Sequence, residues 1–108
     1  MKTNKYLKSG LRYEICVYKK CIKIIKLFGS FMLETFSKID VDIIAEFNDN
    51  HYKLFVLDLK ESKFLTSFAV SKIIYFYKVV KSNNNLFVIQ NASAQAMSVF
   101  KLANIESL

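Results

Sequence analysis

The sequence has no proline and no tryptophan, and its 108 residues include only two glycines and two cysteines. Two glycines can hardly build a glycine-rich phosphate loop, so the common nucleotide-binding motifs are excluded. Zinc takes about four protein ligands, and His51 is the single histidine. We therefore expect no metal ion and no cofactor.

The two cysteines, Cys16 and Cys21, lie five residues apart. They could face each other across a hairpin and form a disulfide, but two cysteines without a secretory signal are more often reduced thiols of a cytosolic protein. The basic N-terminus is not followed by an uninterrupted apolar segment, and no apolar run approaches the about 20 residues of a membrane helix. We expect a cytoplasmic protein without direct membrane insertion.

Arginine is almost absent, although the formal net charge is +7. Residues 1–27 carry eight basic residues and one acidic residue, residues 28–62 carry three and seven, and residues 63–108 carry five and one. The excess therefore lies mainly at the N-terminus. Specific reading of bases usually relies on arginine, and Arg12 is the single one. We expect no nucleic-acid partner.

Apolar residues make up 53% of the chain and include ten phenylalanines. A chain of this length and composition suits one domain with its own hydrophobic core. Residues 1–12 are polar and basic without a hydrophobic period, which predicts a frayed N-terminal tail. Residues 13–108 form the predicted domain.

Short apolar runs and helical spacings alternate along this domain. Residues 13–18 and 21–27 read as the strands of a hairpin that turns at Lys19 and Lys20, and Gly29 is expected to end the second strand. The apolar runs 54–59 and 86–90 predict strands covered on both faces. Helices are predicted over 33–47, 68–81 and 94–103, with Ser93 as an N-cap and Asn104 as a left-handed C-cap. The stripe of the second helix is Ala69, Ile73, Phe76 and Val80.

The order of these elements predicts an α/β fold. Strands that alternate with helices imply right-handed crossovers and a parallel sheet. The N-terminal hairpin adds an antiparallel part, so the expected fold is a mixed, mostly parallel sheet packed by about three helices.

Residues 54–69 resemble STAS domains, the family of bacterial anti-sigma factor antagonists. Members of this family read as an apolar strand ending in Asp-Leu, a polar link, an apolar pair, and Asp-Ser-x-Gly at the start of a helix. The corresponding residues here are Leu57-Asp58-Leu59, the link 60–63, Phe64-Leu65, and Thr66-Ser67-Phe68-Ala69. The likeness of order extends over about residues 13–105.

The resemblance implies a function in protein binding rather than catalysis. Carried over by position, Ser67 is the serine that a partner kinase, itself an anti-sigma factor, phosphorylates. The implied partner-binding residues are Thr66, Ser67, Phe68, Ala69 and Lys72. A phosphate at the start of a helix is tolerated by the helix dipole, so modification could repel the partner without unfolding the domain.

The motif departs from the family pattern, since Thr66 stands for the family's aspartate, Phe68 for a small residue and Ala69 for its glycine, and we expect the usual final strand and fourth helix to be missing or very short. Thr66, Phe68 and the short C-terminus favour a second interpretation. The alternative is a STAS adaptor without a switch, a subunit of a lipid-transport or signalling assembly in which Ser67 merely caps a helix. A homodimer is a further option.

Other candidate residues have simpler explanations. Asp58 and Glu61 would carry catalysis if the domain were an enzyme, but the sequence supplies no partner for them, and Asp58 is expected to be a solvated residue at a strand end. His51 lies in a polar turn without an evident orienting group. Within Tyr75-Phe76-Tyr77 we expect at least one ring in the core.

Overall fold

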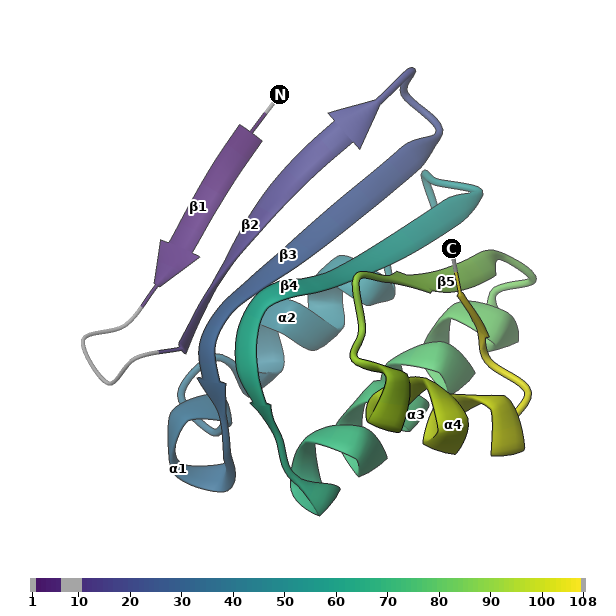
Figure 1. The fold of residues 1–108 in the computed structure, drawn as a ribbon. Helices are drawn as coiled ribbons and strands as arrows, with labels where there is room; N and C mark the ends of the chain where they lie inside the picture. Colours follow the sequence, from purple (N-terminus) through teal and green to yellow (C-terminus); the bar gives the residue numbers. More distant parts are fainter. Residues whose placement is uncertain (1, 7–10, 108) are drawn as a thin grey trace.

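A single six-stranded sheet runs through the computed structural model, which describes residues 2–6 and 11–107 (Figure 1). Its strands are β1 (Lys2–Tyr6), β2 (Leu11–Tyr18), β3 (Ile22–Phe31), β4 (Leu54–Leu65), β5 (Leu86–Gln90) and β6 (Glu106–Ser107). They lie side by side in chain order. The pairs β1–β2 and β2–β3 are antiparallel, and β3–β4, β4–β5 and β5–β6 are parallel. The predicted mixed, mostly parallel α/β fold is confirmed.

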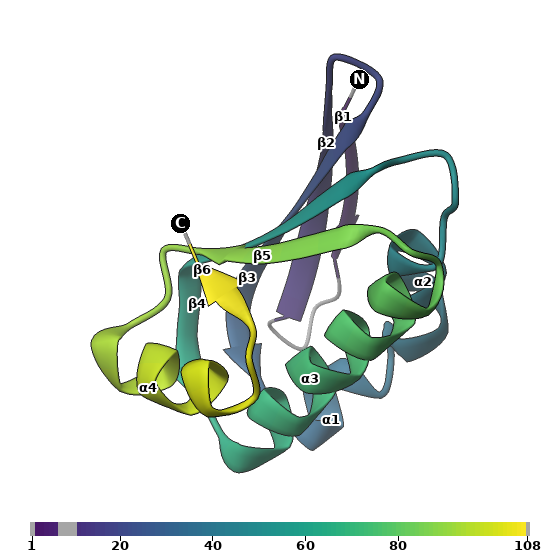
Figure 2. The ribbon, with the colours of Figure 1, turned by 90° about the vertical axis from the view of Figure 1, so that its right-hand side faces the viewer.

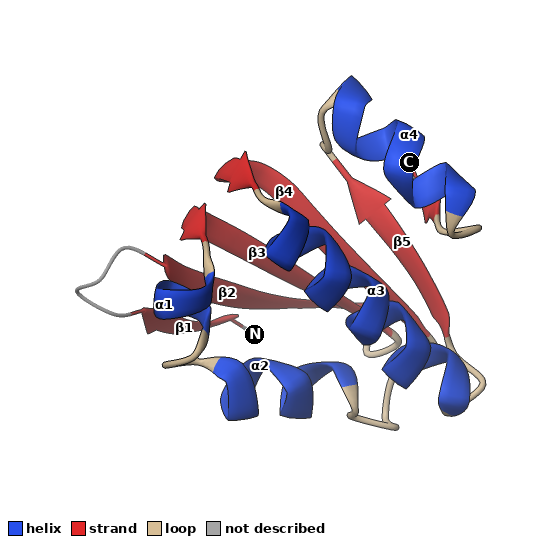
Figure 3. Cartoon of the chain, turned by 90° about the horizontal axis from the view of Figure 1, so that it is seen from below, coloured by secondary structure: helices blue, strands red, loops and turns tan. Residues whose placement is uncertain are grey.

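Helices lie on one side of this sheet (Figures 2 and 3). Within the described residues they are α1 (Leu33–Phe36), α2 (Asp40–Phe47), α3 (Ser67–Ser82) and α4 (Ala94–Leu102). The helix α3 packs against β4 and β5, and α4 packs beside α3 and contacts β6. None of the helices in the described ranges is long and apolar enough to cross a membrane.

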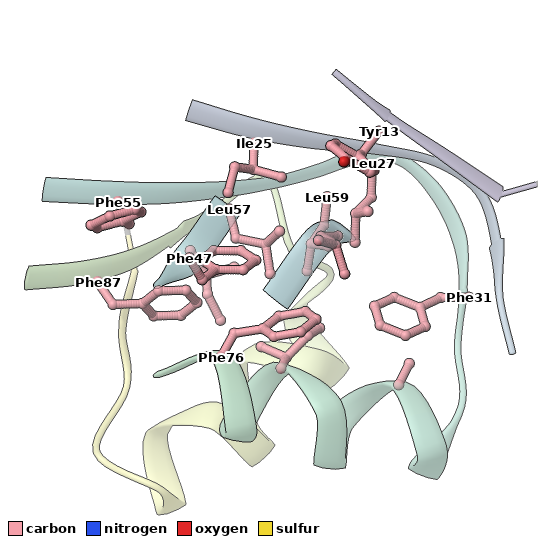
Figure 4. Packing of buried hydrophobic residues seen from close by; sticks show 14 of the residues in the cluster. Tyr13, Ile25, Leu27, Phe31, Phe47, Phe55, Leu57, Leu59, Phe76 and Phe87 are labelled. Atoms are coloured by element: carbon pink, nitrogen blue, oxygen red, sulfur yellow. The ribbon is translucent and has the colours of Figure 1, made fainter. Parts of the chain in front are cut away.

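The core lies between the sheet and these helices (Figure 4). Alternate residues of β2–β5 point into it, and the predicted stripe of α3 is fully buried against them. The rings of Phe47 from α2 and Phe76 from α3 stack with centroids 4.5 Å apart. Full burial of one such side chain stabilises the fold by about 1.5–3 kcal/mol, so this layer of phenylalanines holds α2 and α3 to the sheet.

The predicted N-terminal tail is wrong for Lys2–Tyr6, which forms β1 and pairs with β2 from Lys2↔Cys16 to Tyr6↔Arg12. It is also wrong for Leu11 and Arg12, which belong to β2, with Leu11 fully buried. Residues 1 and 7–10 of that tail lie outside the described residues. A segment without hydrophobic period can still join a sheet because the ladder consists of backbone hydrogen bonds. It also covers the edge that β2 would otherwise expose.

Two strands are longer than predicted. Gly29 does not end β3; it adopts a φ of 100° beside a shift in the β3–β4 register, and the strand continues to Phe31. Glycine takes this left-handed conformation without steric cost, so it bends the strand. Likewise, β4 runs through the predicted polar link to Leu65. The pairing of β4 with β5 ends at Asp58, and beyond that residue β4 is paired with β3 alone.

The single helix predicted over 33–47 is two helices. The chain leaves the first after Phe36, and α2 starts at Asp40. Asp40 and Asp42 lie in the first turn of α2, where negative charge is favourable. Phe36, Ile39, Ile43 and Phe47 are buried, whereas Leu33 is exposed. Over residues 2–6 and 11–107 there are accordingly four helices rather than about three.

The hairpin turn is confirmed at Lys19 and Lys20, whose φ angles of 55° and 60° are those of a type I′ turn. Cys16 pairs with Ile24 in the β2–β3 register, so it does not face Cys21, and both thiols are free. At the other end of the chain Asn104 has the expected left-handed φ of 60°. The short final strand is β6.

Candidate functional site

Ser67 is the first residue of α3, directly after the long strand β4. Its side chain is exposed, and its hydroxyl has no hydrogen-bond partner among the described side chains and backbone groups. The extended conformation of β4 carries the chain past the end of β5 before the helix starts. Ser67 therefore stands at the carboxyl edge of the sheet.

The cap of α3 is Thr66, not Ser67. The Thr66 hydroxyl oxygen accepts a hydrogen bond from the Ala69 N–H over 3.1 Å. The same hydroxyl donates to the carbonyl oxygen of Phe31, also over 3.1 Å. An N-cap accounts for about 1 kcal/mol of stability. Because Thr66 fills this role, the cap interpretation of Ser67 is wrong and its hydroxyl is available for other chemistry.

A groove of about 320 Å³ opens beside Ser67, between the first turns of α3 and α4. Its lining is Ser67, Val70, Ser93, Gln95, Ala96 and Val99. Ser93 caps α4, because its hydroxyl accepts from the Ala96 N–H over 3.1 Å. The groove combines apolar walls with hydroxyl and amide groups, a mixture suited to a partner's side chain or peptide segment.

Phe68 and Lys72 belong to a different surface of α3. The Phe68 ring is half-buried and meets Phe31 and Phe36 edge-on, with centroids 6.3 and 5.8 Å away. The Lys72 ammonium lies over the rings of Phe36 and Phe68 at 5.6 and 5.8 Å. Phe68 thus fills the edge of the core, and Lys72 covers it.

The five residues inferred for partner binding are therefore not one surface. Ser67 lines the groove, Phe68 and Lys72 form the aromatic flank, and the Thr66 hydroxyl is used in the cap. Ala69 is fully buried, so we reassign it from partner contact to packing. It occupies a helical position, where alanine is about 1 kcal/mol more favourable than the family's glycine.

Most of the groove lining was not recognised in the sequence. The sequence indicated only a capping role for Ser93 and no binding role for Val70, Gln95, Ala96 and Val99. A usable signal existed, since parallel strands end at one edge of a sheet. Two neighbouring parallel strands, each followed by a capped helix, place the two helix starts side by side.

Asp58 is not the solvated strand-end residue that was expected. It is buried, and its Oδ1 atom accepts hydrogen bonds from the Lys60 N–H and the Asn91 side-chain amide, both over 3.0 Å. Together with Lys26, Lys60 and Glu61 it borders a hollow of only about 100 Å³. These contacts give Asp58 a structural role, holding the loop after β5 against β4.

His51 has an orienting partner after all, since its Nδ1 atom lies 2.6 Å from Oδ1 of Asp49. The other oxygen of Asp49 lies 3.2 Å from Nζ of Lys23, which is buried and also contacts Glu46 Oε1 at 2.6 Å. Partial burial pulls the pKa of Asp49 upward, but hydrogen bonds from His51 and Lys23 outweigh it and lower the pKa below its ordinary 3.8. Across the described ranges, no three potential ligands gather as a metal site.

Comparisons with known proteins identify the fold. No family model and no curated protein sequence matches this chain. The unphosphorylated anti-sigma factor antagonist SpoIIAA superposes with a TM-score of 0.73 at 14% identity, over 89% of this chain and 86% of that one. The phosphorylated form of the Bacillus protein gives 0.70 at 13% identity, over 89% and 90%. An antagonist from Mycobacterium paratuberculosis gives 0.73 at 11% identity, over 94% and 88%.

At these identities the likeness shows the fold, so the chain has the STAS-like α/β fold of anti-sigma factor antagonists. The resemblance seen in residues 54–69 is confirmed at that level. Both of these structural neighbours are described as anti-sigma factor antagonists.

Proposed function

We propose that this protein is a cytoplasmic regulator of the anti-sigma factor antagonist kind, which binds an anti-sigma factor through the groove between α3 and α4 and is switched at Ser67. The observation that carries this proposal is that two neighbouring residues at the start of α3 have separate roles. Thr66 makes the cap, and Ser67, one residue later, presents a free hydroxyl at the groove.

A phosphate on Ser67 would be compatible with the fold. The first turn of a helix has N–H groups without intrahelical partners, and Thr66 engages the N–H groups of Ala69 and Val70. Those of Ser67 and Phe68 remain at the positive end of the helix dipole, which favours an anion. The cap need not break when the phosphate is added.

The same phosphate would change binding strongly. It adds about −1.5 to −2 charges and three acceptor oxygens at the rim of a groove whose walls include Val70 and Val99. A partner that buries apolar or acidic groups there would have to desolvate or oppose that charge. Modification of Ser67 would therefore release the partner.

The test is a parallel capture from lysate of the source organism with four baits, analysed by quantitative proteomics. The baits are wild type, Ser67→Ala, Ser67→Asp and Ser37→Asp. Ser37 is an exposed serine between α1 and α2, outside the groove lining, so it controls for added negative charge. We expect wild type, Ser67→Ala and Ser37→Asp to recover an ATPase-type anti-sigma factor. Ser67→Asp should recover at least tenfold less.

A second function is favoured by Thr66, which brings no carboxylate to the start of α3. In this alternative the protein is an adaptor without a switch in a lipid-transport or signalling assembly. All four baits would then recover the same transporter or scaffold subunits in equal amounts. That outcome would contradict the switch and leave the groove as a constant docking site.

A further inference from the structure

The strands β3, β4 and β5 begin at the same end of the sheet, which we call the amino edge (Figure 1). Their first residues, Ile22, Leu54 and Leu86, are aligned in register. Backbone hydrogen bonds join the segments before these strands. The N–H of Lys53 donates to the carbonyl oxygen of Cys21 over 3.0 Å, and the N–H of Leu86 donates to that of Lys53 over 2.9 Å. The hairpin turn and the loops before β4 and β5 therefore form one continuous surface.

Four exposed lysines belong to the amino edge. Lys19 and Lys20 form the hairpin turn, Lys53 precedes β4, and Lys81 lies in the last turn of α3. Lys81 reaches this edge because it borders, with Leu86, a hollow of about 90 Å³. Over residues 2–6 and 11–107 none of these four lysines forms an ion pair. The edge therefore presents four uncompensated positive charges.

The two carboxylates beside the amino edge are already occupied. Glu46 Oε1 and Asp49 Oδ2 lie 2.6 and 3.2 Å from the buried Nζ of Lys23. The other oxygen of Asp49 contacts His51. These carboxylates are held by an ammonium group of the core, so they do not neutralise the exposed lysines.

Exposed apolar side chains lie among these charges. Tyr18 is 53% exposed and Leu86 is 61% exposed. The Lys19 ammonium lies 5.3 Å from the centre of the Tyr18 ring, and Lys81 shares the small hollow with Leu86. Basic groups around exposed apolar side chains are the combination that binds the interface of an anionic bilayer. Tyrosine in particular is enriched at that depth.

We propose that the amino edge docks on an anionic membrane surface. Leu86 and Tyr18 enter the headgroup region, and the four lysines face lipid phosphates. Each lysine near such a surface strengthens binding by about fivefold. The docking is peripheral, since only loops and strand ends meet the lipid.

A nucleic acid is a second polyanion that four lysines could meet. Its phosphates would leave Leu86 and Tyr18 in water, so the exposed apolar side chains would have no role. The single arginine, Arg12, lies elsewhere, with its guanidinium 3.8 Å from the centre of the Phe28 ring. The observations therefore favour lipid, and nucleic-acid binding is an outcome that the test must exclude.

A protein docked in this way keeps its groove free. The helix α3 runs from Ser67 at the groove to Lys81 at the amino edge. A helix rises about 1.5 Å per residue, so these two ends lie about 21 Å apart. The inference goes beyond the proposed switch and does not depend on it.

The first test is flotation of the full chain with vesicles of pure phosphatidylcholine and with vesicles containing one third phosphatidylglycerol. Wild type should float only with the second kind. The charge variant is Lys20→Glu with Lys53→Glu, and its control is Lys38→Glu with Lys60→Glu, which changes exposed lysines away from the amino edge. Both variants lower the net charge of +7 by four, to +3. The first should bind at least tenfold more weakly than the second.

The second test separates apolar insertion from charge. Leu86→Ser is compared with Leu33→Ser, because Leu33 on α1 is exposed to nearly the same extent, 59% against 61%. Circular dichroism confirms that each variant is folded. We expect Leu86→Ser to bind vesicles with phosphatidylglycerol at least fivefold more weakly than wild type. Leu33→Ser should bind like wild type.

An acrylodan label on the free thiol of Cys21 reports the orientation. In a Cys16→Ser background its emission should shift to the blue with vesicles that contain phosphatidylglycerol. A label on Ser37→Cys, with both natural cysteines replaced by serine, should show no shift.

Three outcomes would overturn the proposal. They are no flotation of wild type, equal losses in the two charge variants, and equal binding by Leu86→Ser and Leu33→Ser. Binding to duplex DNA that Lys20→Glu with Lys53→Glu abolishes, without vesicle binding, would assign the edge to nucleic acid. None of the substituted residues lines the groove, so lipid docking and the switch at Ser67 fail separately.

Discussion

The hydroxyl of Thr66 donates a hydrogen bond to the carbonyl oxygen of Phe31, at a distance of 3.1 Å. This contact ties the start of α3 to the end of β3, 35 residues earlier in the chain. Since the same hydroxyl caps the helix, Thr66→Val should lower the free energy of unfolding by about 1–2 kcal/mol. Urea unfolding measures this change. Thr66→Ser keeps both hydrogen bonds and should cost less than half as much; equal losses would contradict the double role.

Ser67→Asp should leave the fold as stable as wild type or slightly more stable. The cap is made by Thr66, so it is not lost, and a carboxylate in the first turn of a helix contributes about 0.3–1 kcal/mol. Thermal unfolding at low salt checks this, with Ser82→Asp as the control in the last turn of α3. There the same charge opposes the dipole and should destabilise. A large loss of stability in Ser67→Asp would make its binding defect uninformative.

Because of Tyr13, we expect the free energy of unfolding to fall at alkaline pH. Its ring is buried, and its hydroxyl has no hydrogen-bond partner in the part of the chain that the structure describes. Burial, followed by the charges of Glu46 and Asp42, raises its pKa from 10.0 to about 12. The folded state therefore holds the neutral phenol in a range where the unfolded state ionises. Stability should be unaffected below pH 10 and fall between pH 10 and 12.

Tyr13→Phe removes that alkaline loss and a buried hydroxyl without a partner. We expect it to be neutral or up to about 1 kcal/mol more stable at pH 7. Urea unfolding at pH 7 and at pH 11 measures both effects, with Tyr18→Phe on the exposed end of the hairpin as the control. A clear loss of stability at pH 7 would indicate that the Tyr13 hydroxyl is hydrogen-bonded.

Because of Asp49, we expect the free energy of unfolding to fall at acid pH as well. Its pKa is lowered in the folded protein, so its contribution is complete above 3.8 and is lost as pH falls through the folded value. Asp49→Asn should cost about 1–2 kcal/mol at pH 7, because it removes one of two carboxylates beside the buried Lys23. The difference from wild type should shrink as pH falls below 3.8 and through the lowered pKa of the folded state. Glu34→Gln, an exposed carboxylate on α1, should show no comparable effect.

The sequence pattern predicted those features of the fold that depend on residues close together in the chain. The spacing of Ala69, Ile73, Phe76 and Val80 placed the buried face of α3 correctly, because helical periodicity depends only on nearby residues. The strand β1 was missed because its place depends on backbone pairing with β2, which leaves no hydrophobic signature. The break between α1 and α2 was missed because one apolar stripe continues through both.

Only one side of the groove could be predicted from the sequence, for the same reason. Ser67 could be placed from its motif, but Ser93 and Gln95 come from a segment about 26 residues later and reach the groove only through the parallel pairing of β4 with β5. Nothing in the sequence indicated that Lys23 is buried. A lysine in a strand is expected to face solvent, and the burial of Lys23 depends on its ion pairs with Glu46 and Asp49 at the end of α2.

The strand order of the sheet has a consequence for how the protein is made. Because β1 to β6 lie side by side in the order in which they occur along the chain, each new strand pairs with the one synthesised just before it. No position in the sheet has to be kept open for a segment still to be translated. The sheet can therefore grow from one edge to the other as the chain leaves the ribosome, and each strand waits for its next partner only while the segment between them is synthesised.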